Sequence, residues 1–125
     1  MSHPTDCKYS ETHEWHKVEG ETITLGLTQF AVDQLTDVTY VEMKKLGFKF
    51  KAGDIVGEVE SVKTTSDIYG AFGGEVTEVN SAVVADPSLL NSDPYGKGWL
   101  LKAKVIDPAG LSKLMDAEAY SAAHH

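Results

Sequence analysis

The sequence contains no arginine. All 11 basic residues are lysines, against 19 acidic residues, and the formal net charge is −8. Arginine supplies the forked contacts that clamp phosphate and read guanine, and an acidic surface repels a polyanion. We therefore expect no nucleic-acid partner.

Cysteine and long apolar runs are also scarce. Cys7 is the single cysteine, so an internal disulfide cannot form and a reducing compartment is expected. No apolar run approaches the ~20 residues that a bilayer span needs, and the first residues lack a signal or transit pattern. These features predict a protein without membrane association in the bacterial cytoplasm, although a processed mitochondrial chain would look the same.

Proline is rare, with four in the chain and none between residues 5 and 86, so long stretches are free to pair as strands. Short segments of alternating or β-branched character recur between turn signals, as in an all-β sandwich or barrel. We expect one domain over residues 1–125, with its core between about 9 and 120. The predicted strands are "TITLGL" with one buried face (Ile23, Leu25, Leu27), "VTYVEM", "IVGEVES" after a turn at Gly53-Asp54, "SDIY", "EVTEVN" and "WLLKAKVI".

Helical signals are few. Thr28 is placed to cap a short helix, "QFAVDQLT", that would bury Phe30, Ala31 and Leu35. Asp-Pro pairs, which start helices, precede a short turn at "DPSLLN" and a terminal helix within "DPAGLSKLMDAEAY". The apolar stripe of that terminal helix would consist of Leu111, Leu114, Met115 and Ala119.

The candidate metal and acid–base groups are weak. His13 and His16 are three residues apart near His3, but on a strand this spacing turns two side chains to opposite faces, and no cysteine cluster is nearby. We expect no metal site. The acidic residues that alternate with apolar ones are typical of a solvated strand face, although a catalytic pair among them stays open. These are Glu58, Glu60, Asp67, Glu75 and Glu78.

Lys63 lies in "ESVKTTSD", between two predicted strands and therefore at or beside a hairpin tip. Its neighbours Ser61, Thr64, Thr65 and Ser66 are small, which would let the active site of another protein close over the tip. From the residues alone, an ordinary solvated lysine remains the commoner case.

The segment "ESVKTTSDIYGAFGGEVTEVN" resembles the lipoyl-lysine region of the glycine cleavage system H proteins. The segments "KYSETHEW", "LGLTQFAVDQLTDVTYVEM", "LLNSDPYGKGWLLKAKV" and "DAEAY" match that family in the same order, so the resemblance runs from Tyr9 to Tyr120. It implies an all-β fold with small peripheral helices. The architecture would be a lipoyl/biotinyl-type hybrid barrel-sandwich of two antiparallel sheets with a C-terminal helix.

Three departures from the family pattern stand out. Thr64-Thr65 replaces alanine-containing pairs, and Gly70-Ala71 replaces Ser-Pro, which removes a rigid element from the loop. Thr36 stands where the family usually has glycine, which puts in doubt any backbone conformation that requires glycine there.

By resemblance, lipoic acid would be attached to Lys63 through an amide bond, and the chain would be a carrier without catalytic activity, functioning as a monomer. It would receive the aminomethyl group of glycine from the pyridoxal-phosphate-dependent glycine decarboxylase (P protein). It would deliver that group to the tetrahydrofolate-dependent aminomethyltransferase (T protein). Dihydrolipoyl dehydrogenase (L protein) would reoxidise the arm, and a lipoate-attaching enzyme would install it.

The resemblance also implies roles for nearby polar residues. Glu60 and Asp67 would be read by the attaching enzyme, while Thr12, Glu14 and Asp67 would hold the loaded arm, whose amine is cationic. An alternative is that Glu14 and Asp67 only satisfy backbone donors.

Three other functions are alternatives. A biotin carrier has a similar fold, but its lysine normally lies between methionines, and here the neighbours are Val62 and Thr64. The chain could also be a lipoyl carrier or lipoyl donor for another enzyme system, or a β-rich binding module that is never modified.

Overall fold

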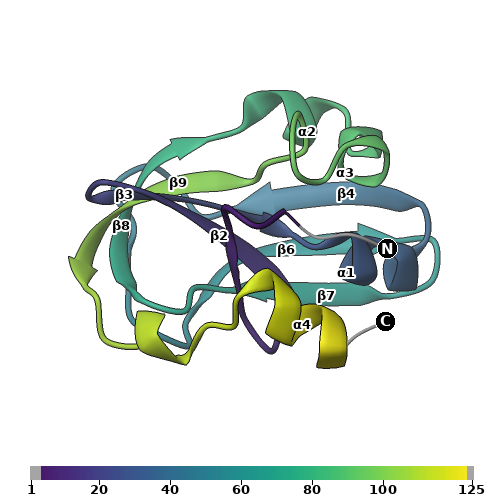
Figure 1. Cartoon of the computed structure of the whole chain (residues 1–125). Coiled ribbons are helices and arrows are strands. Elements are labelled where there is room, and N and C mark those ends of the chain that lie inside the picture. The colour runs from purple at the N-terminus through teal and green to yellow at the C-terminus, as the bar shows by residue number, and fades with distance from the viewer. Residues whose placement is uncertain (1–3, 124–125) are drawn as a thin grey trace.

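Two antiparallel sheets form the computed structural model, which describes residues 4–123 (Figure 1). The larger sheet has six strands in the order β1-β2-β3-β9-β8-β5, and the smaller has the order β4-β6-β7. This arrangement confirms the predicted β-rich fold with small helices at the periphery. The strands are β1 (Lys8–Tyr9), β2 (Glu14–Glu19), β3 (Thr22–Leu27), β4 (Val38–Met43), β5 (Lys49–Phe50), β6 (Ile55–Ser61), β7 (Thr65–Tyr69), β8 (Gly73–Val79) and β9 (Leu101–Asp107).

The core lies between the two sheets and takes apolar side chains from both. Ile23 and Val76 come from the larger sheet, and Val59 and Ile68 from the smaller one; all four are buried in one cluster. Burying each such side chain stabilises the fold by about 1.5–3 kcal/mol. In β9, Leu101 and Ala103 are buried, whereas Lys104 is exposed.

Strand β3 differs from its prediction because both of its faces are covered. Thr24 and Gly26, expected to face solvent, are buried as well. The indole of Trp15, on β2, covers Gly26 so closely that a Cβ there would lie 2.5 Å from the ring. The indole N–H donates to the carbonyl oxygen of Pro94 at 3.0 Å, which fixes the ring in this position.

Helix α1 (Gln29–Leu35) begins as predicted, with the hydroxyl of Thr28 accepting from the backbone N–H of Ala31 at 3.2 Å. The expected buried face is only partly right. Val32 and Leu35 are buried, whereas Phe30 and Ala31 are half-buried. Phe30 instead packs its ring against the imidazole of His13, with 4.9 Å between ring centroids.

Two short helices, α2 (Ser81–Ala85) and α3 (Ser88–Ser92), connect β8 to β9. The first was not predicted; Asn80 caps it by accepting from the N–H of Ala82 at 3.1 Å. The second occupies the expected turn after Asp86-Pro87.

The sequence predicted one terminal helix from Pro108 onward, and this prediction is wrong. A 3₁₀ turn, η1 (Leu111–Lys113), is followed by an isolated β-bridge and then by α4 (Ala117–Ala123). The helix is interrupted because Met115 exchanges two backbone hydrogen bonds of 2.7 Å with Tyr9. Of the predicted apolar stripe, Leu111, Leu114 and Met115 are half-buried and Ala119 is exposed. The buried side chain of α4 is Tyr120.

Within residues 4–123, no helix has the length and apolar character needed to cross a membrane. The domain prediction also includes residues 1–3 and 124–125, which lie outside the described part, and it stays a prediction.

Candidate functional site

Lys63 lies at the tip of a hairpin, as the sequence predicted. Strand β6 ends at Ser61 and β7 begins at Thr65, so the lysine is exposed within a three-residue turn. The hydroxyl of Ser61 accepts from the backbone N–H groups of Lys63 and Thr64 at 3.2 and 3.1 Å. The turn is therefore shaped by its own hydroxyl group, and the lysine side chain is left free.

Carboxylates line the outer face of the smaller sheet beside this hairpin. Glu42, Glu58 and Asp67 are direct neighbours across β4, β6 and β7, and Glu60 lies between Tyr40 and Thr65 in the next row. Like charges in neighbouring positions repel. Among the described residues, the ion pair that forms joins Lys17, on β2 of the larger sheet, to Asp6 at 3.7 Å. The carboxylates on the outer face of the smaller sheet are therefore not neutralised by an ion pair.

Two of the acidic residues considered for acid–base chemistry lie elsewhere. Glu75 and Glu78 are on β8, where they face Lys104 and Lys102 across the larger sheet. The structure therefore divides the acidic residues between the two sheets.

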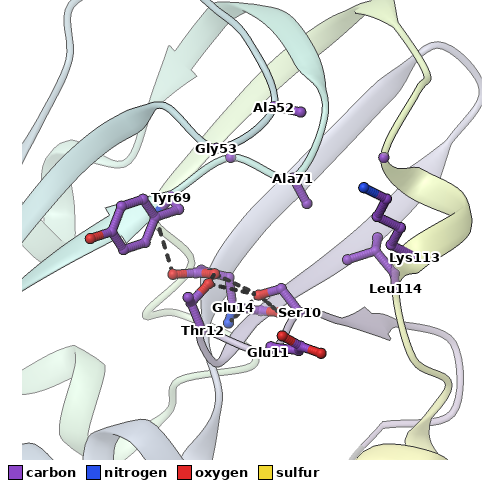
Figure 2. Close-up of a pocket in the computed structure, with 12 residues that line it drawn as sticks. Ser10, Glu11, Thr12, Glu14, Ala52, Gly53, Tyr69, Ala71, Lys113 and Leu114 are labelled. Carbon is purple, nitrogen blue, oxygen red and sulfur yellow. Dashed lines mark hydrogen bonds between the residues drawn. The ribbon is translucent and has the colours of Figure 1, made fainter.

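A cleft of about 510 Å³ opens at the other end of β7 (Figure 2). Four short segments line it: the loop before β2, the turn at Ala52-Gly53, the end of β7 and the 3₁₀ turn η1. The lining residues are Ser10, Glu11, Thr12, Glu14, Ala52, Gly53, Tyr69, Gly70, Ala71, Gly110, Lys113 and Leu114.

Glu14 is completely buried beside this cleft. Its carboxylate accepts from the hydroxyl of Ser10 at 2.5 Å, from the hydroxyl of Thr12, and from the backbone N–H of Tyr69 at 3.2 Å (Figure 2). Burial raises the pKa of Glu14 above its ordinary value, while the hydrogen bonds from Ser10 and Thr12 act in the opposite direction.

Of the other two residues predicted to hold the arm, only Thr12 lies at Glu14. Thr12 contacts it directly, and Asp67 lies two residues before Tyr69 on the exposed outer face of β7, away from the cleft lining. Ser10 was missed. Ser10 reaches Glu14 because residues 11–13 form a turn, in which the N–H of His13 donates to the carbonyl of Ser10 at 3.1 Å.

The two histidines have separate environments. The imidazole Nδ1 of His13 lies 2.8 Å from the hydroxyl of Tyr120. His16 is buried on β2 against the ring of Phe72, and burial lowers its pKa to about 4. Within the described part of the chain, no three His, Cys, Asp or Glu side chains are grouped to hold a metal ion, and His3 lies outside that part.

Comparison with known proteins gives one consistent result. Residues 7–125 match the family described as "Glycine cleavage H-protein". The glycine cleavage system H protein of Symbiobacterium thermophilum is 50% identical over 119 residues, covering 95% of this chain and 93% of that protein. The H protein of Methylacidiphilum infernorum is 48% identical over 120 residues, covering 96% and 94%.

A solved structure agrees with the sequence relatives. The crystal structure of a glycine cleavage system H protein from Mycobacterium marinum superposes with a TM-score of 0.89 at 35% identity, over 97% of this chain and 98% of that one. Both the fold and the sequence similarity extend over almost the whole chain. The chain therefore belongs to the glycine cleavage H-protein family.

Proposed function

We propose that this chain is the lipoyl carrier of a glycine cleavage system and that Lys63 bears the lipoyl group. The observation that carries the proposal is the exposed Lys63 at the tip of the β6–β7 hairpin, in a chain that matches the family over residues 7–125. No other lysine of the sequence lies in such a turn between small hydroxylated residues.

The residues present fit an arm attached by an amide bond. The ammonium group of Lys63 is solvent-accessible, its flanking residues are small, and the cleft beside Glu14 lies at the far end of the adjoining strand. When attached, lipoate supplies a two-electron dithiol/disulfide couple that carries a one-carbon cargo. The protein contributes display and docking, and tethering raises the local concentration of the arm to roughly the millimolar range.

Two residues of the hairpin are proposed as recognition points for the lipoate-attaching enzyme. Glu60 and Asp67 flank Lys63 on the two strands, and both point to the outer face. The backbone carbonyl of Glu60 is held by the hydroxyl of Thr39 at 3.2 Å, so this part of the hairpin has a defined position.

Thr12, Glu14 and Asp67 are proposed to hold the loaded arm, whose cargo ends in a cationic amine. Thr12 and Glu14 would act inside the cleft, where exclusion of water strengthens the attraction of a carboxylate for a cation. Asp67, on the exposed face of β7, would attract the amine more weakly because solvent screens it.

The proposed partners of the chain are the decarboxylase (P protein), the aminomethyltransferase (T protein), dihydrolipoyl dehydrogenase (L protein) and the attaching enzyme. The chain itself is proposed to be a non-catalytic monomer of the bacterial cytoplasm, without nucleic-acid, membrane or metal partners. Purified unmodified chain should not release carbon dioxide from glycine. Lipoylated chain added to the decarboxylase should restore exchange of bicarbonate with the glycine carboxyl group.

The attachment site is tested by peptide mapping after incubation with lipoate, ATP and a lipoate ligase. We expect one lipoyl group, on Lys63, and none in Lys63→Arg, while the exposed-lysine control Lys97→Arg is modified normally. Modification that persists in Lys63→Arg would overturn the assignment. A chain that is lipoylated but does not support the exchange reaction would instead indicate a carrier for another enzyme system, and a chain that is never lipoylated would indicate a binding module.

A further inference from the structure

Asn91, on helix α3, holds the connection between α1 and β4. Its side-chain N–H donates to the backbone carbonyl of Thr36 at 2.6 Å, and its side-chain oxygen accepts from the backbone N–H of Val38 at 2.9 Å. The amide orientation follows from these partners, because a carbonyl needs a donor and an N–H needs an acceptor. One side chain therefore fixes both peptide groups that flank the Cα atom of Asp37.

The second of these peptide groups continues to the Lys63 hairpin. The N–H of Val38 and the carbonyl of Asp37 belong to the same peptide unit, and that carbonyl accepts from the backbone N–H of Val62 at 3.1 Å. A chain of hydrogen bonds thus runs from Asn91 through one peptide group to the residue next to Lys63. Hydrogen bonds in such a series polarise and strengthen one another.

This contact has a special place in the turn. The other hydrogen bonds described for residues 62–64 close on Ser61 or Thr65, within the hairpin itself. Among the described residues, the bond from Val62 to Asp37 is the hydrogen bond that ties the turn to the rest of the fold. The position of the Lys63 turn relative to the sheets therefore depends on the conformation around Asp37.

That conformation is not one the local sequence favours. Thr36 has φ 63° and ψ −138°, a region that glycine occupies readily and a β-branched residue does not. An unsupported segment would tend to relax away from it. The two hydrogen bonds from Asn91 hold the two peptide groups that directly follow the Cα atom of Thr36, and they oppose the relaxation.

We propose that Asn91 is a positioning residue for Lys63, and that it holds the hairpin in the arrangement that the lipoate-attaching enzyme recognises. The proposal rests on the proposed attachment at Lys63. If the turn occupies the recognised position for only a fraction of the time, the apparent affinity of the enzyme for the carrier falls by that fraction. The KM for the carrier should then rise while kcat stays the same.

The test compares Asn91→Ala with Asn80→Ala. Asn80 is a matched control because its side chain also bridges backbone groups, donating to the carbonyls of Lys97 and Trp99 at 2.8 and 2.7 Å, away from the hairpin. In Asn91→Ala, hydrogen exchange at the Val62 amide should accelerate about five-fold or more under native conditions, as expected for one lost hydrogen bond. The KM for the carrier in lipoylation by a ligase with lipoate and ATP should rise by a similar factor. Neither value should change in Asn80→Ala.

A second variant tests the link between the strained backbone and the turn. Thr36→Gly relieves the strain, so in the double variant Thr36→Gly, Asn91→Ala the tendency to relax is weaker, and Val62 protection and the KM should return part of the way to their wild-type values. Unchanged Val62 exchange in Asn91→Ala, or a KM that rises without any change in Val62 exchange, would refute the role of Asn91. Lipoylation of Lys63→Arg would refute the attachment site instead, and the exchange measurement would still decide whether Asn91 holds the turn.

Discussion

The carboxylate of Glu14 accepts a hydrogen bond from the backbone N–H of Tyr69 at 3.2 Å, and so joins β2 of the larger sheet to β7 of the smaller one. The same carboxylate is covered by the hydroxyls of Ser10 and Thr12. The Glu14 carboxylate therefore provides a hydrogen-bond acceptor for β7, the strand that begins beside Lys63. Glu14 also lines the cleft proposed for the loaded arm. The two roles considered for Glu14 are compatible in this geometry.

The first prediction concerns retention of the cargo. In carrier loaded with the aminomethyl group, Glu14→Gln and Asp67→Asn should both release formaldehyde and ammonia faster than wild type. The effect of Asp67 should be only about two- to five-fold and should disappear with added salt, because exposed charge pairs are weak and screened. The effect of Glu14 should be larger and should persist in salt, because the group is buried.

The control for that experiment is Glu58→Gln, which removes an outer-face carboxylate directly opposite Asp67. It should release cargo at the wild-type rate. Equal rates for all variants at low salt would show that Glu14 and Asp67 are structural and that other groups hold the arm.

The second prediction concerns acid stability and His16. Burial lowers the pKa of His16 to about 4 from an unfolded value of 6.5, so between these values the unfolded chain binds the extra proton. Stability linked to His16 is therefore present above pH ~6.5 and is lost as the pH falls through ~4, by about 3 kcal/mol in total. Urea unfolding at several pH values should show this slope in wild type and not in His16→Leu.

Glu14 contributes with the opposite sign in an overlapping range. Its folded pKa is raised above 4.5, so its contribution falls as the pH increases from 4.5 through the folded pKa. The difference between wild type and His16→Leu cancels this contribution. Parallel curves for the two proteins from pH 4 to 6.5 would contradict the role of His16.

The third prediction is that Thr36→Gly stabilises the protein. A non-glycine residue in such a conformation destabilises the folded state by about 1–3 kcal/mol. Replacing it with glycine removes this strain, but the unfolded chain becomes more flexible, which costs roughly 0.5–1 kcal/mol. The net gain in the free energy of unfolding should be about 1 kcal/mol, measured with urea. Thr36→Ala retains a Cβ atom and should gain less, and a Gly variant less stable than wild type would show that the backbone at Thr36 is not strained.

The fourth prediction is that Gly26→Ala destabilises the protein by about 1–3 kcal/mol through overpacking. The added methyl group would collide with the indole of Trp15, which cannot move without breaking its hydrogen bond to Pro94. Thermal unfolding of Gly26→Ala should show a lower Tm. The control is Gly20→Ala, which reports the backbone effect alone, because a Cβ at Gly20 meets no atom within 4 Å while φ is 65°. Equal losses in the two variants would contradict the steric explanation.

Much of the fold could be predicted because its signals are local. The strands alternate, Thr28 caps α1, and the Lys63 turn lies between two regular strands. Two of the failures come from partners outside the segment concerned. Met115 leaves the predicted terminal helix because Tyr9 binds it, and Gly26 is buried because a tryptophan on the neighbouring strand β2 covers it.

The candidate site shows the same division. Lys63 could be located from its own neighbours, whereas the burial of Glu14 depends on the N–H of Tyr69, 55 residues later. The contribution of Asn91 could not be predicted from the sequence, because it acts through a peptide group of a different loop. Nothing in the local sequence around Asn91 indicates those partners.

The strand order also has a consequence for the sequence of events at the ribosome. Strand β3 (Thr22–Leu27) is completed on one side only when β9 (Leu101–Asp107) has been made, and Asn91 follows Val62 by 29 positions. At about 5–20 residues per second, β9 is translated roughly 4–16 s after β3. The hairpin bearing Lys63 therefore emerges from the ribosome before Asn91, which is proposed to hold it in place. We expect the lipoyl group proposed for Lys63 to be attached after translation of the chain is nearly complete.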